Sequence, residues 1–207
     1  MGNRLPFSLS RKLETCLPIT LRSAADGRLY TIDPDFHTVL ACLRRLADPN
    51  RDELGKRLYL AARFFLGEPP PDYIALFSNF VMENEAPACG GEPLLDFEQD
   101  AGAIYASFRQ QYGLDLLRTP LHWYEFRELL AGLNEQTAFG ARVRLRALDE
   151  SSVAPEDRPA IRRLKEQVAL RPRVGREEQA LLAELDRRLA AGESPDEVLA
   201  KLKNREE

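Results

Sequence analysis

Three acidic residues, Asp96, Glu98 and Asp100, are the strongest candidates for chemistry in this chain of 207 residues. Residues four apart share one face of an α-helix, so Asp96 and Asp100 could present two carboxylates to a cation or act as a general acid and base. The structural alternative is that these acids cap a helix and interact with its dipole. We favour that alternative. Asp100 adjoins an apolar stripe, where a buried hydrogen-bonding role would also fit.

His122 is the second candidate for chemistry, because an imidazole beside Trp123 could act as a base. No serine, cysteine or aspartate has a spacing that indicates a catalytic triad, so we interpret His122 as a capping or packing residue. Neither Gly-x-x-x-x-Gly-Lys nor Gly-x-Gly-x-x-Gly occurs, and nucleotide binding therefore has no motif to support it. We expect a protein that is not an enzyme and has no cofactor.

The cysteines are odd in number and widely separated, at Cys16, Cys42 and Cys89. Without Cys-x-x-Cys spacing they are typical of reduced, structural thiols in a cytosol. A metal site would require folding alone to bring them together with His37 and His122, whereas structural zinc sites usually have ligand pairs that are close in sequence. We expect no metal site.

Arginines near the middle of the chain could line a nucleic-acid groove. The formal net charge of −4 and the sequence pI of about 5.4 argue against a general attraction to nucleic acid. Neighbouring acids dilute the positive potential, so a solvated face is the better interpretation, although a nucleic-acid-binding regulator stays an alternative. The arginines are Arg142, Arg144, Arg146, Arg158, Arg162 and Arg163.

The elements that must position these side chains centre on residues 94–148. A helix beginning at Asp96, with a capping box to Gln99 and a terminating Gly113, is predicted by an apolar stripe. The stripe consists of Phe97, Ala101, Ile104, Tyr105, Phe108 and Tyr112.

Two further helices should follow this first one. Thr119 and Pro120 have the types of an N-cap and a first helical residue, and Asn134 the type of the next N-cap. Residues 142–146 alternate with period two and could form a strand instead, but we favour a helix.

The rest of the chain predicts a mainly α fold with a small N-terminal β-hairpin at residues 18–33, where Asp26-Gly27 supplies the turn. Asp33 and Pro34 should begin the next helix, and residues 86–93 form the best internal linker. We predict a mobile arm over 1–15, one helical domain over 16–170 and an amphipathic C-terminal helical extension over 171–207. Further helices are expected near 54–66, 73–81, 156–170 and 176–191, with a last short one from Ser194.

Two sets of apolar side chains are candidate partner-binding residues. Trp123 and Tyr124 would point in different directions on one helix, so we expect one of them to be exposed. Leu181, Leu185 and Leu189 form a narrow stripe in the extension that suits docking on a partner helix.

An ordered set of short motifs runs through the central segment: Asp100-Ala101, Ile104-Tyr105-Ala106-Ser107-Phe108, Tyr112-Gly113-Leu114-Asp115-Leu116, Leu121-His122-Trp123, Phe126, Gly132-Leu133 and Thr137. In this order and spacing the segment resembles the bacteriophage gene-product-fifteen family, and the resemblance extends back to Leu17-Pro18 and forward to about Leu170. Proteins of that family are small, are encoded just before the tape measure protein of long-tailed phages and are regarded as tail assembly chaperones.

The resemblance implies a tail assembly chaperone in the cytoplasm of the bacterial host, absent from the mature virion. It would bind the tape measure protein and keep it soluble, without ATP, until tail tube protein polymerises around it. Self-association is expected if many copies line a long client. No run has the apolar length needed to cross a bilayer, so we expect no membrane association. The alternative is a structural or adaptor subunit of the tail.

Overall fold

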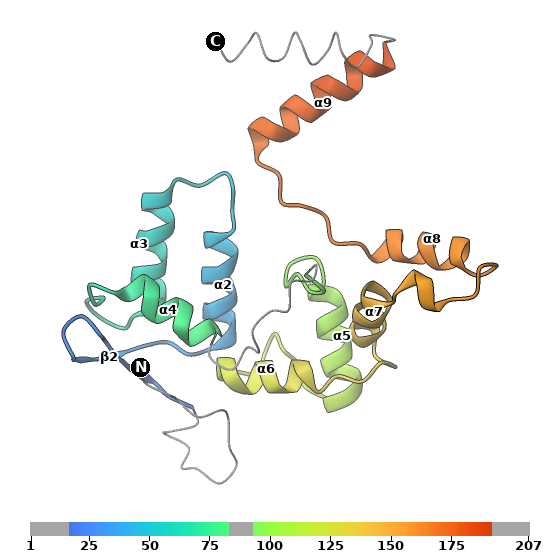
Figure 1. Ribbon diagram of the computed structural model, residues 1–207. Coiled ribbons are helices and arrows are strands. Elements are labelled where there is room, and N and C mark those ends of the chain that lie inside the picture. The colour runs from blue at the N-terminus through green and yellow to red at the C-terminus, as the bar shows by residue number, and fades with distance from the viewer. Residues whose placement is uncertain (1–16, 83–92, 192–207) are drawn as a thin grey trace. The chain divides into compact units, whose positions relative to one another are not determined.

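A computed structural model describes residues 17–82 and 93–191, and helices dominate them (Figure 1). The mainly α fold, the small N-terminal hairpin and the amphipathic C-terminal helix are as the sequence predicts. No described helix has both the length and the apolar character needed to cross a membrane. The predicted arm over 1–15, almost all of the linker over 86–93 and the short helix from Ser194 lie outside the described residues.

The chain divides into two compact units. The first consists of Met1–Leu46 and Glu53–Arg171, and the second of Ala47–Asp52 and Pro172–Glu207. Within the second unit, helix α9 (Arg176–Ala190) begins where the backbone N–H of Arg176 donates to Asn50 Oδ1 at 2.7 Å. Every other helix and strand described below belongs to the first unit.

The hairpin pairs strand β1 (Thr20–Arg22) with strand β2 (Leu29–Thr31), and Leu21 lies opposite Tyr30. Gly27 takes φ +74°, in the left-handed region that glycine adopts without strain. The side chain of Leu21 is buried in the core of the first unit. Packing on the helices therefore stabilises a ribbon that would not be stable alone.

Three helices follow the hairpin: α2 (Phe36–Leu46), α3 (Glu53–Phe64) and α4 (Tyr73–Met82). Helix α2 begins three residues after the predicted N-cap Asp33. The Asp33 carboxylate accepts from the backbone N–H of Asp35 at 3.2 Å and from Thr38 Oγ1 at 2.7 Å, so it organises the turn before the helix.

Helix α5 (Ala101–Tyr112) also begins later than predicted, and the predicted capping box at Asp96 is wrong. Asp96 Oδ1 accepts from the backbone N–H groups of Glu98 and Gln99, which closes a separate turn ahead of the helix. The predicted end is confirmed: Gly113 has φ +68° and donates its N–H to the carbonyl of Phe108.

The two predicted N-caps after α5 are also wrong. Helix α6 (Trp123–Ala131) begins after His122, not at Thr119, and helix α7 (Ala138–Ala147) begins after Thr137, not at Asn134. Thr137 Oγ1 accepts from the backbone N–H of Gly140 at 3.1 Å. The helix prediction for 142–146 is confirmed over the strand alternative. A short 3₁₀ turn, η1 (Glu150–Ser152), and helix α8 (Arg158–Val168) complete the unit.

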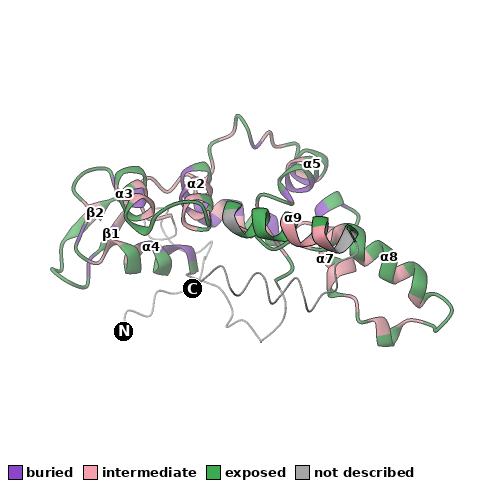
Figure 2. Ribbon diagram, turned by 90° about the horizontal axis from the view of Figure 1, so that it is seen from above, coloured by how far each residue is buried: buried purple, intermediate pink, exposed green. Residues whose placement is uncertain are grey.

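The core of the first unit is rich in stacked aromatic rings. Phe126 lies at its centre, with its ring centroid 4.5 Å from that of Phe36 and 5.5 Å from that of Phe108. Buried residues from α2, α5 and α6 thus meet at one ring. Figure 2 shows buried positions on α2 and α5, whereas the drawn faces of α8 are mostly exposed.

Candidate functional site: an apolar pocket

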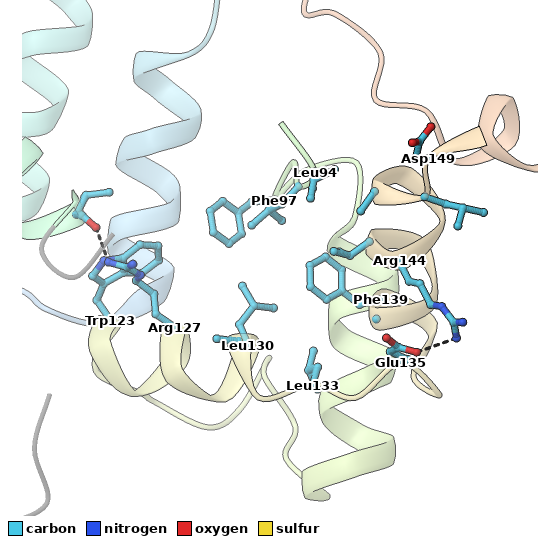
Figure 3. A pocket seen from close by; sticks show the side chains of 17 residues that line it. Leu94, Phe97, Trp123, Arg127, Leu130, Leu133, Glu135, Phe139, Arg144 and Asp149 are labelled. Atoms are coloured by element: carbon cyan, nitrogen blue, oxygen red, sulfur yellow. Dashed lines mark hydrogen bonds and ion pairs between the residues drawn. The ribbon is translucent and has the colours of Figure 1, made fainter. Parts of the chain in front are cut away.

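An apolar pocket of about 760 Å³ lies between α6, α7 and the segment that leads into α5 (Figure 3). This volume is in the range of pockets that hold ligands or partner side chains. We call it the α6–α7 pocket. Its apolar lining consists of Val81, Leu94, Leu95, Phe97, Trp123, Leu130, Ala131, Leu133, Phe139, Val143, Ala147 and Leu148.

Charged side chains lie at the sides of this apolar surface. Arg127 lies next to Trp123 on one side, and Asp149 lies on the opposite side, beyond Leu94 (Figure 3). Arg127 Nη1 donates to the carbonyl of Val81 at 2.8 Å, and Arg144 Nη1 pairs with Glu135 at 2.7 Å. The pocket therefore has an apolar centre, with Arg127 and Asp149 on opposite sides and the Arg144–Glu135 pair also in its lining.

Helix α5 holds the two walls of the pocket in place by hydrogen bonds from its buried face and its last turn. Ser107 Oγ accepts from the backbone N–H of Phe139 at 2.9 Å, at the start of α7. Tyr112 Oη donates to the carbonyl of Leu129 at 2.8 Å, near the end of α6. Both walls are thus tied to one helix, and the pocket is formed without a ligand.

The connection between the walls is fixed in the same way by Gln111. Its Nε2 donates to the carbonyl of Gly132 at 2.8 Å, and its Oε1 accepts from the backbone N–H of Asn134 at 2.9 Å. A single side chain thereby satisfies two backbone groups in the turn from α6 to α7.

A buried ion pair joins α5, α7 and the segment before α5. Asp100 is fully buried, and its two carboxylate oxygens accept from Arg146 at 2.6 and 2.8 Å, with Arg142 at 3.4 Å. Arg146 also donates to the backbone carbonyls of Leu94 at 2.8 Å and Val168 at 2.6 Å. The buried hydrogen-bonding role expected for Asp100 is confirmed.

Burial by itself would raise the pKa of Asp100. The hydrogen bonds from Arg146, from the backbone N–H of Asp96 and from Arg142, together with the positive charge of Arg146, outweigh it and hold the pKa below the ordinary aspartate value. The carboxylate is therefore charged at neutral pH, as its two arginine partners require.

Gly140 lines the pocket where the backbone of α7 lies close to the backbone of Asn134. A Cβ atom at this position would lie 2.1 Å from the carbonyl oxygen of Asn134, which belongs to the rigid turn ahead of α7. Only glycine fits at position 140. Its lack of a side chain allows the first turn of α7 to pack directly against the backbone of Asn134.

Trp123 and Tyr124 are both buried, at 2% and 6% exposure, so the prediction that one of them is exposed is wrong. Tyr124 stacks on Phe80, with ring centroids 5.0 Å apart, and Trp123 stacks on Phe126. Core rings lie on both sides of this helix, which the sequence pattern could not show. Trp123 nevertheless lines the pocket, and its indole Nε1 has no hydrogen-bond acceptor in the described part of the chain.

His122 is the N-cap of α6, which confirms the capping interpretation. Its Nδ1 accepts from the backbone N–H of Tyr124 at 3.1 Å, and Glu125 returns a hydrogen bond to the His122 backbone. Nε2 lies 3.0 Å from the carbonyl of Pro18 and must be the protonated nitrogen, since Nδ1 is an acceptor. Burial lowers the pKa of His122, against the opposing effects of the Pro18 carbonyl and the Glu125 charge.

The three acids proposed for chemistry do not converge. Asp96 closes its turn, Asp100 is enclosed by arginines, and Glu98 lies 3.6 Å from Arg44. Burial raises the pKa of the Cys42 thiol to about 12, so this thiol is unreactive. Among the residues that the structure describes, no group of His, Cys, Asp and Glu side chains could hold a metal ion. Cys16 and Cys89 lie outside those residues.

Most of the arginines considered for nucleic acid binding contact acids or carbonyls of the chain itself. Arg142 and Arg146 bind Asp100, and Arg144 binds Glu135. Arg162 lies 3.1 Å from Glu150, and Arg158 donates to the carbonyl of Val153. These contacts favour the interpretation of a solvated face over that of a phosphate-binding groove.

The other candidate residues lie in the second unit, on α9. Leu181 is exposed and Leu185 is half-buried, whereas the side chain of Leu189 lies outside the described residues. Leu182, which the sequence analysis did not single out, is as exposed as Leu181, at 45% each. The sequence analysis also missed the pocket, because its lining comes from segments that are far apart in the sequence, from Val81 to Asp149.

Residues 78–170 match the family described as Bacteriophage Gp15 protein. This segment, called the Gp15 segment below, is similar to that family. The match spans a little under half of the chain and confirms the resemblance over that range. Every residue that lines the α6–α7 pocket lies within the Gp15 segment, whereas the hairpin, α2, α3 and α9 lie outside it. No curated protein and no solved structure matches the chain.

Proposed function

We propose that this protein is a tail assembly chaperone, which binds the tape measure protein and keeps it soluble while the tail tube assembles. The observation that carries the proposal is the preformed apolar pocket, whose lining lies wholly within the Gp15 segment. The protein acts by holding its client, without enzymatic chemistry or ATP. It works in the cytoplasm of the bacterial host and is absent from the mature virion.

The pocket suits an amphipathic helix of the client. Such a helix presents apolar side chains at positions i, i+3, i+4 and i+7, and these can enter a groove between two helices. Each fully buried aliphatic side chain contributes about 1.5–3 kcal/mol, so one pocket binds weakly and many copies along a long client bind strongly. Tail tube protein can then replace the copies one at a time.

Two further functions are distinguishable from this one. A structural or adaptor subunit of the tail would remain in the particle, so mass spectrometry of purified virions separates it from a chaperone. A nucleic-acid-binding regulator would bind DNA or RNA with a strong dependence on salt. The ion pairs made by Arg142, Arg144 and Arg146 within the chain weigh against the regulator.

The direct test is co-expression with the neighbouring tape measure protein. We expect the client to become soluble and to co-purify with several copies of this protein. Ala131 and Ala147 are exposed residues of the pocket lining on its two helical walls, so the double variant Ala131→Glu/Ala147→Glu should abolish co-purification and leave the fold intact. Leu164→Glu, on the exposed face of α8, is the control. An insoluble client with the wild-type protein would refute the chaperone function.

The leucines of α9 are a second candidate for contact with the client, as the sequence predicts. Deletion of residues 171–207 distinguishes the two surfaces. If Leu181, Leu185 and Leu189 hold the client, the truncated protein keeps its fold but solubilises the client less well. If the pocket holds the client, the truncated protein still binds it.

A further inference from the structure

The indole of Trp123 carries the one buried side-chain nitrogen or oxygen atom of the described residues that has no hydrogen-bond partner. The side chain is 2% exposed, and its Nε1 atom is shielded from water as well as from acceptors of the chain. A buried indole N–H usually finds an acceptor, and an unpaired one lowers stability. Phenylalanine would fill much of the same space without an orphaned donor, so tryptophan at position 123 needs a reason other than packing.

The charged side chains that line the α6–α7 pocket all contact groups of the chain itself. Glu135 pairs with Arg144 at 2.7 Å. Asp149 Oδ1 accepts from a backbone N–H of η1 at 2.9 Å, and Arg127 Nη1 donates to a backbone carbonyl of α4 at 2.8 Å. Trp123 also lines the pocket. An occupant can therefore pair with its Nε1–H without breaking a contact that the chain already makes.

The apolar surroundings of Trp123 determine which kind of acceptor suits it. The indole N–H is a neutral donor with one hydrogen, so it needs a single acceptor. A carboxylate would lose its hydration in the apolar lining in exchange for one neutral donor, and an amide would bring two further donors that need acceptors. A serine or threonine hydroxyl on a helix avoids both problems. Its O–H can donate to the carbonyl four residues earlier in the same helix while its oxygen accepts from Nε1.

We infer that the α6–α7 pocket selects client helices that carry a serine or threonine within their apolar face, and that Trp123 Nε1 donates a hydrogen bond to this hydroxyl. This selection rests on the proposed function, because the client helix is taken as the occupant of the pocket. It adds the feature by which one stretch of the client is chosen over another. A uniformly apolar helix would leave the indole N–H unpaired in the complex as well.

The hydroxyl reaches Nε1 only when the lining opens, because the atom is shielded in the free protein. Phe97 is a pocket-lining side chain that can move: it is half-buried and belongs to the turn before α5, not to a helix. Its ring centroid lies 6.0 Å from that of Trp123, and Figure 3 shows it on the side of the pocket where Trp123 lies. A client side chain that displaces this ring would open the space around the indole.

The single tryptophan makes this hydrogen bond directly observable in the wild-type, full-length chain. Overlapping synthetic peptides that cover the neighbouring tape measure protein are added to isotope-labelled protein, whose proton–nitrogen correlation spectrum contains one indole signal. A bound peptide with a threonine on its apolar face should move this signal downfield, as a new hydrogen bond does. The same peptide with valine, which has the same shape, should bind without that shift. Binding peptides that lack a hydroxyl on the apolar face, or an equal shift from the valine peptide, overturn the inference.

Peptide affinities test the same hydrogen bond through variants. The wild-type protein should bind the threonine peptide about fivefold more tightly than the valine peptide, and Trp123→Phe should abolish this preference. Tyr105→Phe is the matched control and should keep the preference, because it removes the polar atom of an aromatic side chain outside the pocket. A preference that Trp123→Phe retains, or tighter binding of a peptide with glutamate in place of threonine, overturns the inference. Peptides that bind without any preference leave the chaperone function standing, whereas no binding by any peptide refutes both.

Discussion

The α6–α7 pocket and helix α9 are both apolar surfaces, but they are held in opposite ways. The pocket walls are fixed by buried bonds to α5, such as Asp100 with Arg146 and Ser107 with the N–H of Phe139. Helix α9 carries local pairs on its own surface, Glu184 with Arg187 and Arg188. The pocket thus depends on contacts between distant segments, whereas the described ion pairs of α9 are local. Substitutions should therefore affect the two surfaces very differently.

The largest effect is expected from Asp100→Asn. Removing the charge leaves Arg146, only 9% exposed, without its carboxylate partner, and breaking a buried ion pair costs about 3–5 kcal/mol of unfolding free energy. Urea denaturation followed by tryptophan fluorescence measures this through Trp123, the only tryptophan. Glu98→Gln, which alters a half-exposed pair with Arg44, should change stability by less than about 1 kcal/mol. Equal effects of the two substitutions would contradict the role of Asp100.

The next largest effect is expected from Gly140→Ala. The added methyl group would meet the backbone of Asn134 at 2.1 Å, so the first turn of α7 must shift, at a cost of about 1–3 kcal/mol. Gly102→Ala is the control in α5, because a methyl group added there would meet nothing within 4 Å and alanine is the better helix former. We expect the control to raise the melting temperature and Gly140→Ala to lower it. The same sign for both would show that the close approach is unimportant.

His122 should make the stability of the first unit depend on pH. Its pKa is lower in the folded protein than in the unfolded chain, so the unfolded chain binds a proton first as the pH falls below about 6.5. Stability is then full above this pH and decreases below it, by at most about 1.4 kcal/mol per pH unit for one proton. Urea midpoints between pH 7.5 and 5 measure the slope. His122→Asn, which retains a capping side chain, should have a flatter profile.

The smallest effect is expected on α9. Glu184→Gln removes two local ion pairs, and such pairs contribute about 0.2–0.5 kcal/mol each. Circular dichroism should show a slight loss of helicity, and the unfolding midpoint of the first unit should not change. A large shift in that midpoint would mean that α9 stabilises the pocket side of the molecule, and the contrast between the two surfaces would fail.

The sequence by itself predicted which segments are helical more reliably than where the helices begin. Periodic apolar residues determine a helical face wherever they occur, and Gly113 ended α5 as expected. The starts depend on which side chain reaches a free N–H group. Thr119 and Asn134 are residue types that often cap helices, but the N-caps of α6 and α7 are His122 and Thr137. Tertiary contacts, such as that of His122 with the carbonyl of Pro18, help to determine where the helix begins.

The pocket was decided by tertiary structure alone. Its lining includes Val81 of α4, residues of the segment before α5, and residues of α6 and α7. The ion pair that joins α7 to the segment before α5 links Arg146 to Asp100, 46 residues away. The sequence did predict the mainly helical fold and the resemblance to the Gp15 family over residues 78–170, and it left a buried role for Asp100 open beside the favoured role in helix capping. Those features depend on residue type and short spacing. The burial of Trp123 and Tyr124 and the shape of the pocket depend on which distant segments meet, and a linear pattern does not encode that directly.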